Sequence, residues 1–431
     1  MRYILDLHIH SAYARACSKS LSPENISYWA RMKGLDVVGT GDFTHPKWLA
    51  ELKSKLKESG NGLFQLNAEY EVSERKILDI PGKDILRTQF MLSSEVSCIY
   101  SKGGKVRRVH ILLYAPDLQT VEKINMKLKK IGRLESDGRP ILGLDAKHLA
   151  EIVFEVNEQC MVVPAHAWTP WFAVFGSKSG FDSLEECFEE LTPKIYAIET
   201  GLSSDLLMNY QVSALDRVML MSNSDAHSSA NLAREANIFE LPQLSYDAIW
   251  NAVKTQDIAC FPATIEFYPE EGMYHFDGHR LCQVSMEPKE TKKHFGLCPT
   301  CKKPLTIGVL NRVRELSDRE YGYIPDGAQK FYRLVGLDDI IADAFGVVGK
   351  KTKRVMKEYQ RIITQGESEL SVLLEGSYVE LEKITDARIV EGIRRNREGD
   401  LYIEPGFDGQ YGKVKVFSEQ DRVTSGQNRL L

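Results

Sequence analysis

Histidine and carboxylate side chains recur at the ends of strand-like segments between residues 8 and 227. His8 and His10 lie two residues apart, and the two-residue period of a strand places both imidazoles on one face. Later segments carry the same residue types: Asp42, His45, Glu95, His110, His166, Glu199, Asp225 and His227. Burying such a set is costly without a cation, and its donors suit Zn²⁺, Mn²⁺ or Fe²⁺ better than Mg²⁺. The array therefore predicts a divalent-metal centre, although a single strand-end histidine is usually an ordinary core or surface residue.

A second group of metal-binding side chains follows further along the chain. Two pairs, His279 with Cys282 and Cys298 with Cys301, are each separated by two residues, which is the spacing of two knuckles that close one tetrahedral Zn²⁺ site. His275 is an alternative fourth ligand. The other five cysteines lie in apolar or small-residue contexts, so we expect free thiols of a cytosolic protein and no disulfide framework.

Alternating strands and helices must position the first group. Strands are expected at 3–9, 36–41, 90–98, 107–114, 160–165, 195–199, 218–223 and about 259–266. Plausible helices fill most of the gaps, and the clearest begins at Ser22-Pro23-Glu24 and ends at Gly34. This alternation predicts an α/β fold with a parallel sheet. Seven or eight strands favour a closed barrel, in which the strand ends converge on one mouth.

Length and composition narrow the class of protein. The 431 residues are 43% hydrophobic and 27% charged, which fits a globular chain of two or three domains, or a barrel with an appendage. Apolar runs fall far short of the ~20 residues that span a bilayer, and the strand-like Tyr3–Leu7 leaves no room for a signal peptide, so a cytoplasmic protein is expected. The net charge of −5 argues against nucleic-acid binding by the whole surface and leaves a local basic face possible.

The motifs of the first group resemble those of the polymerase and histidinol phosphatase (PHP) superfamily. They are the H-x-H of the first strand, the Asp42 segment, Glu95, His110, Pro164-Ala165-His166 and Asp225-Ala226-His227. This resemblance implies a distorted (β/α)7 PHP barrel that binds two or three divalent metals (Zn, Mn, Fe or Mg) and hydrolyses phosphate esters.

The resemblance also implies a ligand set. The first metal would be held by His8, His10, Glu95 and Asp225. Glu95 would bridge to a second metal, which His110 and His166 would also hold.

The expected third site departs from the superfamily pattern. His227 would belong to it, with Asp42 or His45 as a further ligand. Arg15 stands where many members have a histidine, and Phe43 follows Asp42 where the common motif has Asp-His. The third site would therefore be altered, weak or empty.

Longer sequence strings are similar to those of the endonuclease Q family. They lie at 166–172, 176–183, 298–309, 312–319 and 405–409, and so extend over most of the chain. The resemblance implies cleavage of DNA on the 5′ side of deaminated bases (uracil, hypoxanthine, xanthine) or abasic sites, in DNA repair. Asp225 or Asp42 would orient the attacking water, and Arg15 would contact the phosphate.

Basic residues cluster in the second half of the chain. Residues 279–333 carry eleven Lys and Arg against six Asp and Glu, a net of +5, so the remaining residues sum to −10. Beside a phosphoesterase barrel these residues predict a DNA-binding face, whereas each cluster alone could be a solvated charged surface. The candidate DNA contacts are Lys302, Lys303, Arg312, Lys350, Lys351 and Lys353.

The aromatic segment after His166 is the candidate pocket for an extruded base, because such pockets are lined by aromatic or apolar groups. The candidate substrate contacts are Trp168, Trp171, Phe172, Ser177 and Lys178. The alternative is a hydrophobic plug at the barrel mouth.

We expect three domains: a PHP catalytic barrel (1–267), a zinc-binding module (268–337) and a small α+β DNA-binding domain (338–431).

The expected protein is a monomeric metal-dependent endodeoxyribonuclease that binds damaged DNA and no membrane. Residues 427–431 weakly resemble a sliding-clamp-binding tail, and an inert terminus is the alternative. The rival functions are a small-molecule phosphoesterase of the histidinol-phosphatase kind and an inactive DNA-binding scaffold.

Overall fold

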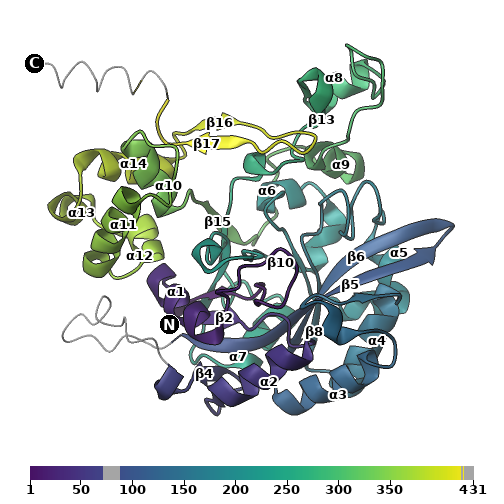
Figure 1. Cartoon of the computed structure of the whole chain (residues 1–431). Helices are drawn as coiled ribbons and strands as arrows, with labels where there is room; N and C mark the ends of the chain where they lie inside the picture. Colours follow the sequence, from purple (N-terminus) through teal and green to yellow (C-terminus); the bar gives the residue numbers. More distant parts are fainter. Residues whose placement is uncertain (71–87, 419–420, 422–431) are drawn as a thin grey trace, which may run out of the picture.

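A central β-sheet organises the computed structural model, which describes residues 1–70, 88–418 and 421 (Figure 1). Its strands follow the order β15-β12-β11-β1-β2-β5-β4-β3, and β6 pairs with β5 and β8, while β7 pairs with β5. The bounds are β1 Arg2–Asp6, β2 Val37–Gly39, β3 Leu56–Glu58, β4 Phe64–Leu66, β5 Gln89–Lys102, β6 Lys105–Ala115, β7 Ile141–Leu142, β8 Met161–Pro164, β11 Ala236–Glu240, β12 Ala263–Glu266 and β15 Lys330–Arg333. Strands β9 (Ala197–Glu199) and β10 (Met219–Met221) form a separate parallel pair.

Each of the eight expected strand ranges contains a strand, but the expectation of a wholly parallel sheet is wrong. Pairs β1–β2 and β2–β5 are parallel, whereas β5–β6, β6–β8, β1–β11 and β11–β12 are antiparallel. The reversal at β5–β6 has a local cause, because Gly103 and Gly104 both adopt positive φ (61° and 73°) in a two-residue hairpin turn.

Strand pairing does not close into a barrel within residues 1–70 and 88–418. Between β1, β10 and β11, asparagine side chains form some of the hydrogen bonds to backbone N–H and C=O groups that strand pairing would otherwise supply. Asn237 donates to the carbonyls of Leu5 (3.2 Å) and Ser222 (2.7 Å), and Asn223 Oδ1 accepts from the N–H of Leu7 (2.8 Å). The fold is therefore mixed α/β, and the expected count of seven barrel strands is not shown.

The expected helices are present around the sheet. Helix α1 (Pro23–Lys33) begins after Ser22, whose hydroxyl accepts from the N–H of Asn25, and ends at Gly34 with φ 92°. A side chain at Gly34 would also collide with Ser368, because a Cβ there would lie 2.4 Å from its Oγ. The other helices of this part are α2 Pro46–Lys55, α3 Leu118–Leu128, α4 Ala146–Val156, α5 Leu184–Phe188, α6 Leu206–Asn209 and α7 Tyr246–Lys254.

No helix in the described residues is both long enough and apolar enough to span a membrane.

The second half of the chain adds two further groups of elements. Around the cysteine pairs lie β13 Asp277–His279, β14 Val284–Met286, α8 Pro288–Lys293 and α9 Val309–Leu316. The C-terminal group contains α10 Leu337–Ala344, α11 Lys353–Gly366, α12 Glu369–Leu374, α13 Tyr378–Ile384, α14 Ala387–Glu398, β16 Tyr402–Glu404 and β17 Lys413–Lys415. The C-terminal helices and α8 lie at opposite sides of the molecule, and the β16–β17 hairpin extends between them (Figure 1). Strand β15 pairs with β12 of the central sheet, although the expected zinc-binding module includes its residues.

Candidate metal centres

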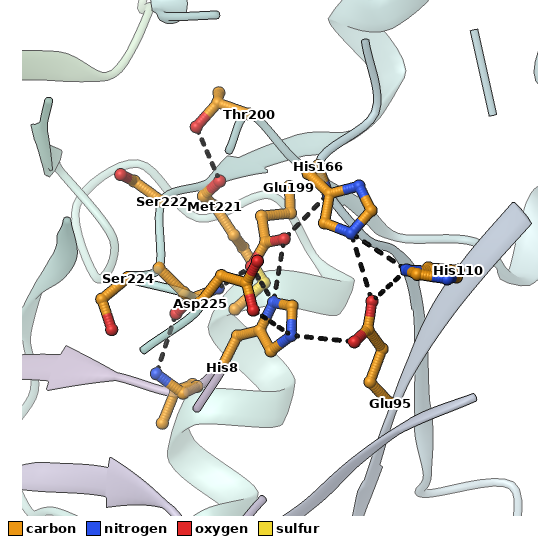
Figure 2. A network of polar contacts seen from close by, with 12 residues as sticks. His8, Glu95, His110, His166, Glu199, Thr200, Met221, Ser222, Ser224 and Asp225 are labelled. Atoms are coloured by element: carbon orange, nitrogen blue, oxygen red, sulfur yellow. Dashed lines mark hydrogen bonds and ion pairs between the residues drawn. The ribbon is translucent and has the colours of Figure 1, made fainter. Parts of the chain in front are cut away.

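Four predicted ligands from three strands or strand ends meet at one point. His8 and His10 follow β1, Glu95 lies on β5 and Asp225 follows β10, and one ligand atom of each lies within 4.8 Å of the others. His10 Nε2 is 3.1 Å from Asp225 Oδ1 and 3.2 Å from Glu95 Oε2. His8 Nε2 is 3.5 Å from both oxygens (Figure 2). We call this group the first cluster.

The donor atoms of the first cluster fit a bound cation. The Nε2 atoms of His8 and His10 and Oδ1 of Asp225 are buried without a hydrogen-bond partner among the described residues. Leaving a buried polar group unsatisfied costs about 1–3 kcal/mol, more when it is charged. Convergent lone pairs of two imidazoles and two carboxylates would be satisfied by a divalent ion of the kind that binds nitrogen and oxygen.

Glu95 also belongs to a second cluster with His110 on β6 and His166 after β8. Glu95 Oε1 lies 2.7 Å from His110 Nδ1 and 3.2 Å from His166 Nε2 (Figure 2). Its other oxygen, Oε2, faces the first cluster. A single buried carboxylate thus presents one oxygen to each cluster, which is the geometry of a bridging ligand between two metal ions.

Two further carboxylates orient the histidines of the first cluster. Glu199 Oε1 lies 3.0 Å from His8 Nδ1, and Asp42 Oδ1 lies 2.9 Å from His10 Nδ1. A carboxylate at Nδ1 keeps the proton there and leaves the Nε2 lone pair free for a metal. Asp42 Oδ2 also accepts from the N–H (2.7 Å) and hydroxyl (2.6 Å) of Ser11. The sequence singled out Glu199 as one of the array but gave it no role.

The residues expected at a third site are not gathered into a metal cluster in the described part of the chain. Asp42 is occupied by His10 and Ser11, as above. His45 Nδ1 accepts from the N–H of Trp48 (3.4 Å) as the N-cap of α2, and its ring stacks on Tyr13 at 4.5 Å. His227 Nδ1 contacts the carbonyl of Asp225 at 2.8 Å. The geometry therefore leaves Asp42 and His45 outside the clusters of candidate ligands, whereas the sequence expected one of them at a third site.

Arg15 is exposed, and its described contact is a backbone N–H bond to Asp137 (3.2 Å), so its expected contact with the phosphate stays a prediction. The guanidinium that reaches the first cluster is that of Arg139, whose Nη1 lies 2.9 Å from Glu95 Oε2. Arg139 lies in a loop without a recognisable motif, so only the fold reveals this contact.

The electrostatic field of the clusters favours positive charge. Burial alone would lower the pKa of His8, but the charges of Glu199, Asp225 and Glu95 raise it well above its ordinary value. Burial raises the pKa of Glu95, yet Arg139 and His110 hold it well below its usual range. Burial lowers the pKa of His110 to about 4, so its imidazole is neutral at pH 7 and can act as a metal ligand.

Three residues of the site have unusual backbone conformations. Asp42, His166 and Asp225 have positive φ values of 48°, 31° and 46°, which are costly for residues other than glycine. Such residues persist where the surrounding structure fixes them, and they cluster at functional sites. Each follows a strand, so the turn it makes re-aims the side chain towards the clusters.

The zinc ligands expected from the sequence form a third cluster. His279, Cys282, Cys298 and Cys301 have donor atoms within 4.8 Å of one another, and His275 is not among them. Burial raises the pKa of the Cys298 thiol, but the backbone N–H groups of Cys301 and Thr300 and the thiols of Cys301 and Cys282 together lower it to about 7. Three sulfurs and one imidazole in this arrangement suit tetrahedral Zn²⁺.

The aromatic segment is divided between the core and the surface. Trp168 is 1% exposed, stacks near Phe175 at 4.7 Å and donates its indole N–H to Asn209 (2.8 Å), so it is a core residue and not a wall of an open pocket. Trp171 is 37% exposed, and the ring of Phe172 lies 4.7 Å from that of His110. The hydrophobic-plug alternative thus describes Trp168, whereas Phe172 borders the second cluster.

Ser177 and Lys178 line a polar cavity of about 440 Å³, together with Lys105, Arg107 and Arg312. Arg312 is buried, pairs with Asp182 and Glu315, and donates to the carbonyls of Phe175 and Phe181. Its expected role as a free DNA contact is therefore corrected to a packing role.

The other expected DNA contacts are exposed lysines or lie near the first cluster. Lys302, Lys303, Lys351 and Lys353 are exposed. Lys350 pairs with Asp339 at 2.8 Å and lines a cavity of about 640 Å³, which Asp225 and His227 also line.

Known proteins resemble this chain over different parts of its length. A family model described as the MJ0043 C-terminal domain matches residues 336–400. The Methanocaldococcus jannaschii protein MJ0043 is 32% identical over 256 residues, which cover 58% of this chain and 31% of that protein, so the match spans about a third of that relative. The Bacillus subtilis protein YqxK is 26% identical over 424 residues, covering 95% of this chain and 98% of that protein.

Two solved structures resemble nearly the whole chain. The lesion-specific endonuclease PfuEndoQ from Pyrococcus furiosus has a TM-score of 0.82 and 29% identity, over 98% of this chain and 99% of that one. An endonuclease Q bound to a 27-mer duplex with an abasic lesion at its active site has a TM-score of 0.82 and 31% identity, over 98% of each chain. The mixed α/β fold, including both appended groups of elements, is thus that of endonuclease Q. This chain belongs to the endonuclease Q family.

Proposed function

We propose that this protein is a metal-dependent DNA repair endonuclease that cleaves the phosphodiester 5′ to deaminated bases (uracil, hypoxanthine, xanthine) or abasic sites. The observation that carries the proposal is the position of Glu95, whose two oxygens face two clusters of metal-binding donors. Two adjacent metal ions are a recurrent arrangement for hydrolysis of phosphate esters. The whole-chain likeness to an endonuclease Q that binds abasic-site duplex supports DNA as the substrate.

The first and second clusters would each hold one divalent ion, Zn, Mn, Fe or Mg. When bound, such ions supply a water of lowered pKa and neutralise charge on the phosphate. Asp225 remains the residue to orient that water, because its side chain is 22% exposed whereas the carboxylate of Asp42 is buried and occupied. Glu199 and Asp42 keep the ring protons of His8 and His10 on Nδ1.

The remaining assignments of the proposal concern DNA binding and domain roles. A structural Zn²⁺ would be held by His279, Cys282, Cys298 and Cys301. Lys302, Lys303, Lys351 and Lys353 would contact phosphates, and Trp171 and Phe172 would border the lesion. We retain the expected division into residues 1–267, 268–337 and 338–431, and the expected monomer, as part of this proposal. The expected clamp-binding tail at 427–431 lies outside the described residues.

Substitution of one ligand from the first cluster tests the proposal. We expect His8→Ala and Asp225→Ala to lower the rate of nicking of a duplex with one uracil or abasic site by 10³-fold or more, since removal of one group that stabilises developing charge already costs about 10²–10³-fold. His148→Ala is the matched control, because His148 is an exposed histidine outside the clusters. Nicking at the wild-type rate by either ligand variant would contradict the assignment.

Metal analysis and substrate choice separate the rival functions. The proposed enzyme should contain metal ions in the first and second clusters in addition to one zinc, whereas a scaffold would contain the zinc alone. A small-molecule phosphoesterase should turn over a simple phosphate monoester and show no shift of DNA mobility.

A further inference from the structure

A loop between the 3-10 turn Leu134–Ser136 and β7 carries a permanent positive charge to the first cluster. Arg139 Nη1 lies 2.9 Å from Glu95 Oε2, and its side chain is 25% exposed whereas that of Glu95 is fully buried. The guanidinium therefore contacts the cluster on one side and is open to solvent on the other. Among the described residues, no other lysine or arginine pairs with the carboxylates of Glu95, Asp225 or Asp42.

The backbone around Arg139 is held against the site. The carbonyl of Pro140 accepts from the N–H of Ser97 on β5 (3.0 Å). Gly138 packs directly on Asp42, where a Cβ would come within 2.3 Å of Oδ2. These contacts fix the residues on both sides of Arg139, so the guanidinium is positioned by the fold and does not depend on a mobile surface side chain.

The location of this charge matters because the expected third metal site is not assembled. Asp42 and His45 are engaged elsewhere, as described above, so they do not present a third set of ligands. The charge of Arg139 acts on Asp225 and His227 as well as on Glu95. A permanent cation thus lies beside Gly138, which packs on Asp42, and acts on His227, and both Asp42 and His227 were expected at the third site.

Arginine is suited to bind a phosphate next to metal ions. Its planar guanidinium has five N–H donors, of which the described residues occupy one side-chain donor, at Glu95. The free donors can bind two oxygens of one phosphate in parallel. Negative charge grows on these oxygens during hydrolysis, so donors already in place stabilise the transition state most.

We propose that Arg139 is a catalytic residue that donates hydrogen bonds to a non-bridging oxygen of the scissile phosphate and supplies a permanent positive charge beside the two clusters. This inference rests on the proposed endonuclease function. It names Arg139, and not Arg15, as the arginine that binds the reacting phosphate.

The test compares Arg139→Gln and Arg139→Lys with the wild type in the full, metal-loaded chain. For Arg139→Gln we expect kcat for nicking of abasic-site duplex to fall about 10²-fold or more, while the metal content of the first and second clusters stays unchanged. Arg139→Lys should recover part of kcat, because it restores the charge without the planar fork. Arg133→Gln is the matched control, since Arg133 is an exposed arginine directly before the 3-10 turn that precedes this loop.

Two further readouts separate the possible failures. A wild-type kcat for Arg139→Gln would overturn the inference. Loss of the metals of the first and second clusters would also overturn it, because it would show that Arg139 only holds Glu95 in place. Binding of inorganic phosphate to the metal-loaded protein, measured by calorimetry, should weaken at least tenfold in Arg139→Gln. If the wild type fails to nick lesion-containing DNA but shows this difference in phosphate binding, the proposed function fails while the role of Arg139 stands.

Discussion

The two regions that carry candidate metal ligands differ in what holds their ligands in place. The ligands of the first and second clusters lie on strands or directly after them, in a region with an extensive buried core. The zinc ligands lie in a small module whose own buried cluster consists of Met286, Cys298 and Leu305. The first region can form its site by packing alone, whereas the second has too little core to do so. Metals bound in the first region would therefore serve chemistry, and a metal bound in the second would serve folding.

Hydrogen bonds to the ligands support the same distinction. In the first cluster Glu199 and Asp42 fix the rings of His8 and His10 from behind. In the zinc module, Cys298 itself belongs to the three-residue core, so a ligand is also one of the main packing residues. Removing metal from the module should therefore disturb its packing, whereas the sheet should keep its shape.

The largest expected effect is loss of the zinc module. Cys298→Ser should abolish zinc binding in the module, where structural zinc contributes about 10–16 kcal/mol of apparent free energy in small zinc domains. We expect residues around 280–306 to become sensitive to trypsin, with new cuts at exposed Lys292, Lys293 and Lys302, while the melting temperature of the sheet changes little. Limited proteolysis read by mass spectrometry measures this. Cys260→Ser, a partly buried thiol outside the module, is the control. Full protection of the module after loss of its zinc would contradict the comparison.

The next effect concerns the bridging carboxylate. Glu95→Gln should lose the metals of both the first and the second cluster, because each cluster loses one anionic ligand. Asp225→Asn should lose only the metal of the first cluster. Nicking should fall by about 10³-fold or more in both variants. The far-ultraviolet circular dichroism and melting temperature should stay close to those of the wild type, because the sheet does not depend on these ions. The number of metal ions bound per chain is measured by mass spectrometry. Equal losses in the two variants would show that Glu95 does not bridge the two clusters.

The sequence predicted both kinds of site from their spacing. The pairs His8/His10 and Cys298/Cys301 are local, so a strand or a knuckle brings their donors together without knowledge of the fold. Helix α1 was equally predictable, because Ser22 and Gly34 encode its ends. The Gly103-Gly104 turn was visible too, but a parallel sheet was expected in its place.

What could not be predicted depends on contacts between distant segments. Arg139 reaches Glu95 across 44 positions, and its own sequence context carries no motif. Arg312 has the sequence context of a DNA-binding residue, yet it is buried against carbonyls more than a hundred positions away. Strand β11 was missed because its place between β1 and β12 is fixed by tertiary pairing.

A smaller effect is expected from the carboxylate behind His8. Glu199→Gln should weaken metal binding at the first cluster by about 10–100-fold, the usual consequence of losing a partner that orients a ligand. The amide can still accept from His8 Nδ1, but it lacks the charge that makes the imidazole a stronger ligand. Titration of the metal-free protein with Mn²⁺ measures the affinity. Glu155→Gln on the exposed face of α4 is the control, and an unchanged affinity in Glu199→Gln would assign Glu199 to packing alone.

The smallest effect should separate attachment of the zinc module from its folding. Asp408, in the turn after β16, accepts from the N–H of Arg280 (2.6 Å), which lies between His279 and Cys282, and from the hydroxyl of Thr306 (2.7 Å), which follows Cys301. Asp408→Asn leaves one oxygen to accept and should cost about 1–2 kcal/mol locally. Amide hydrogen exchange should rise at Arg280 while the zinc stays bound, and Asp400→Asn on an exposed carboxylate should change neither. If zinc is released together with the faster exchange, attachment and folding are one process, and the module is even less independent of its ion than the comparison of the two regions indicates.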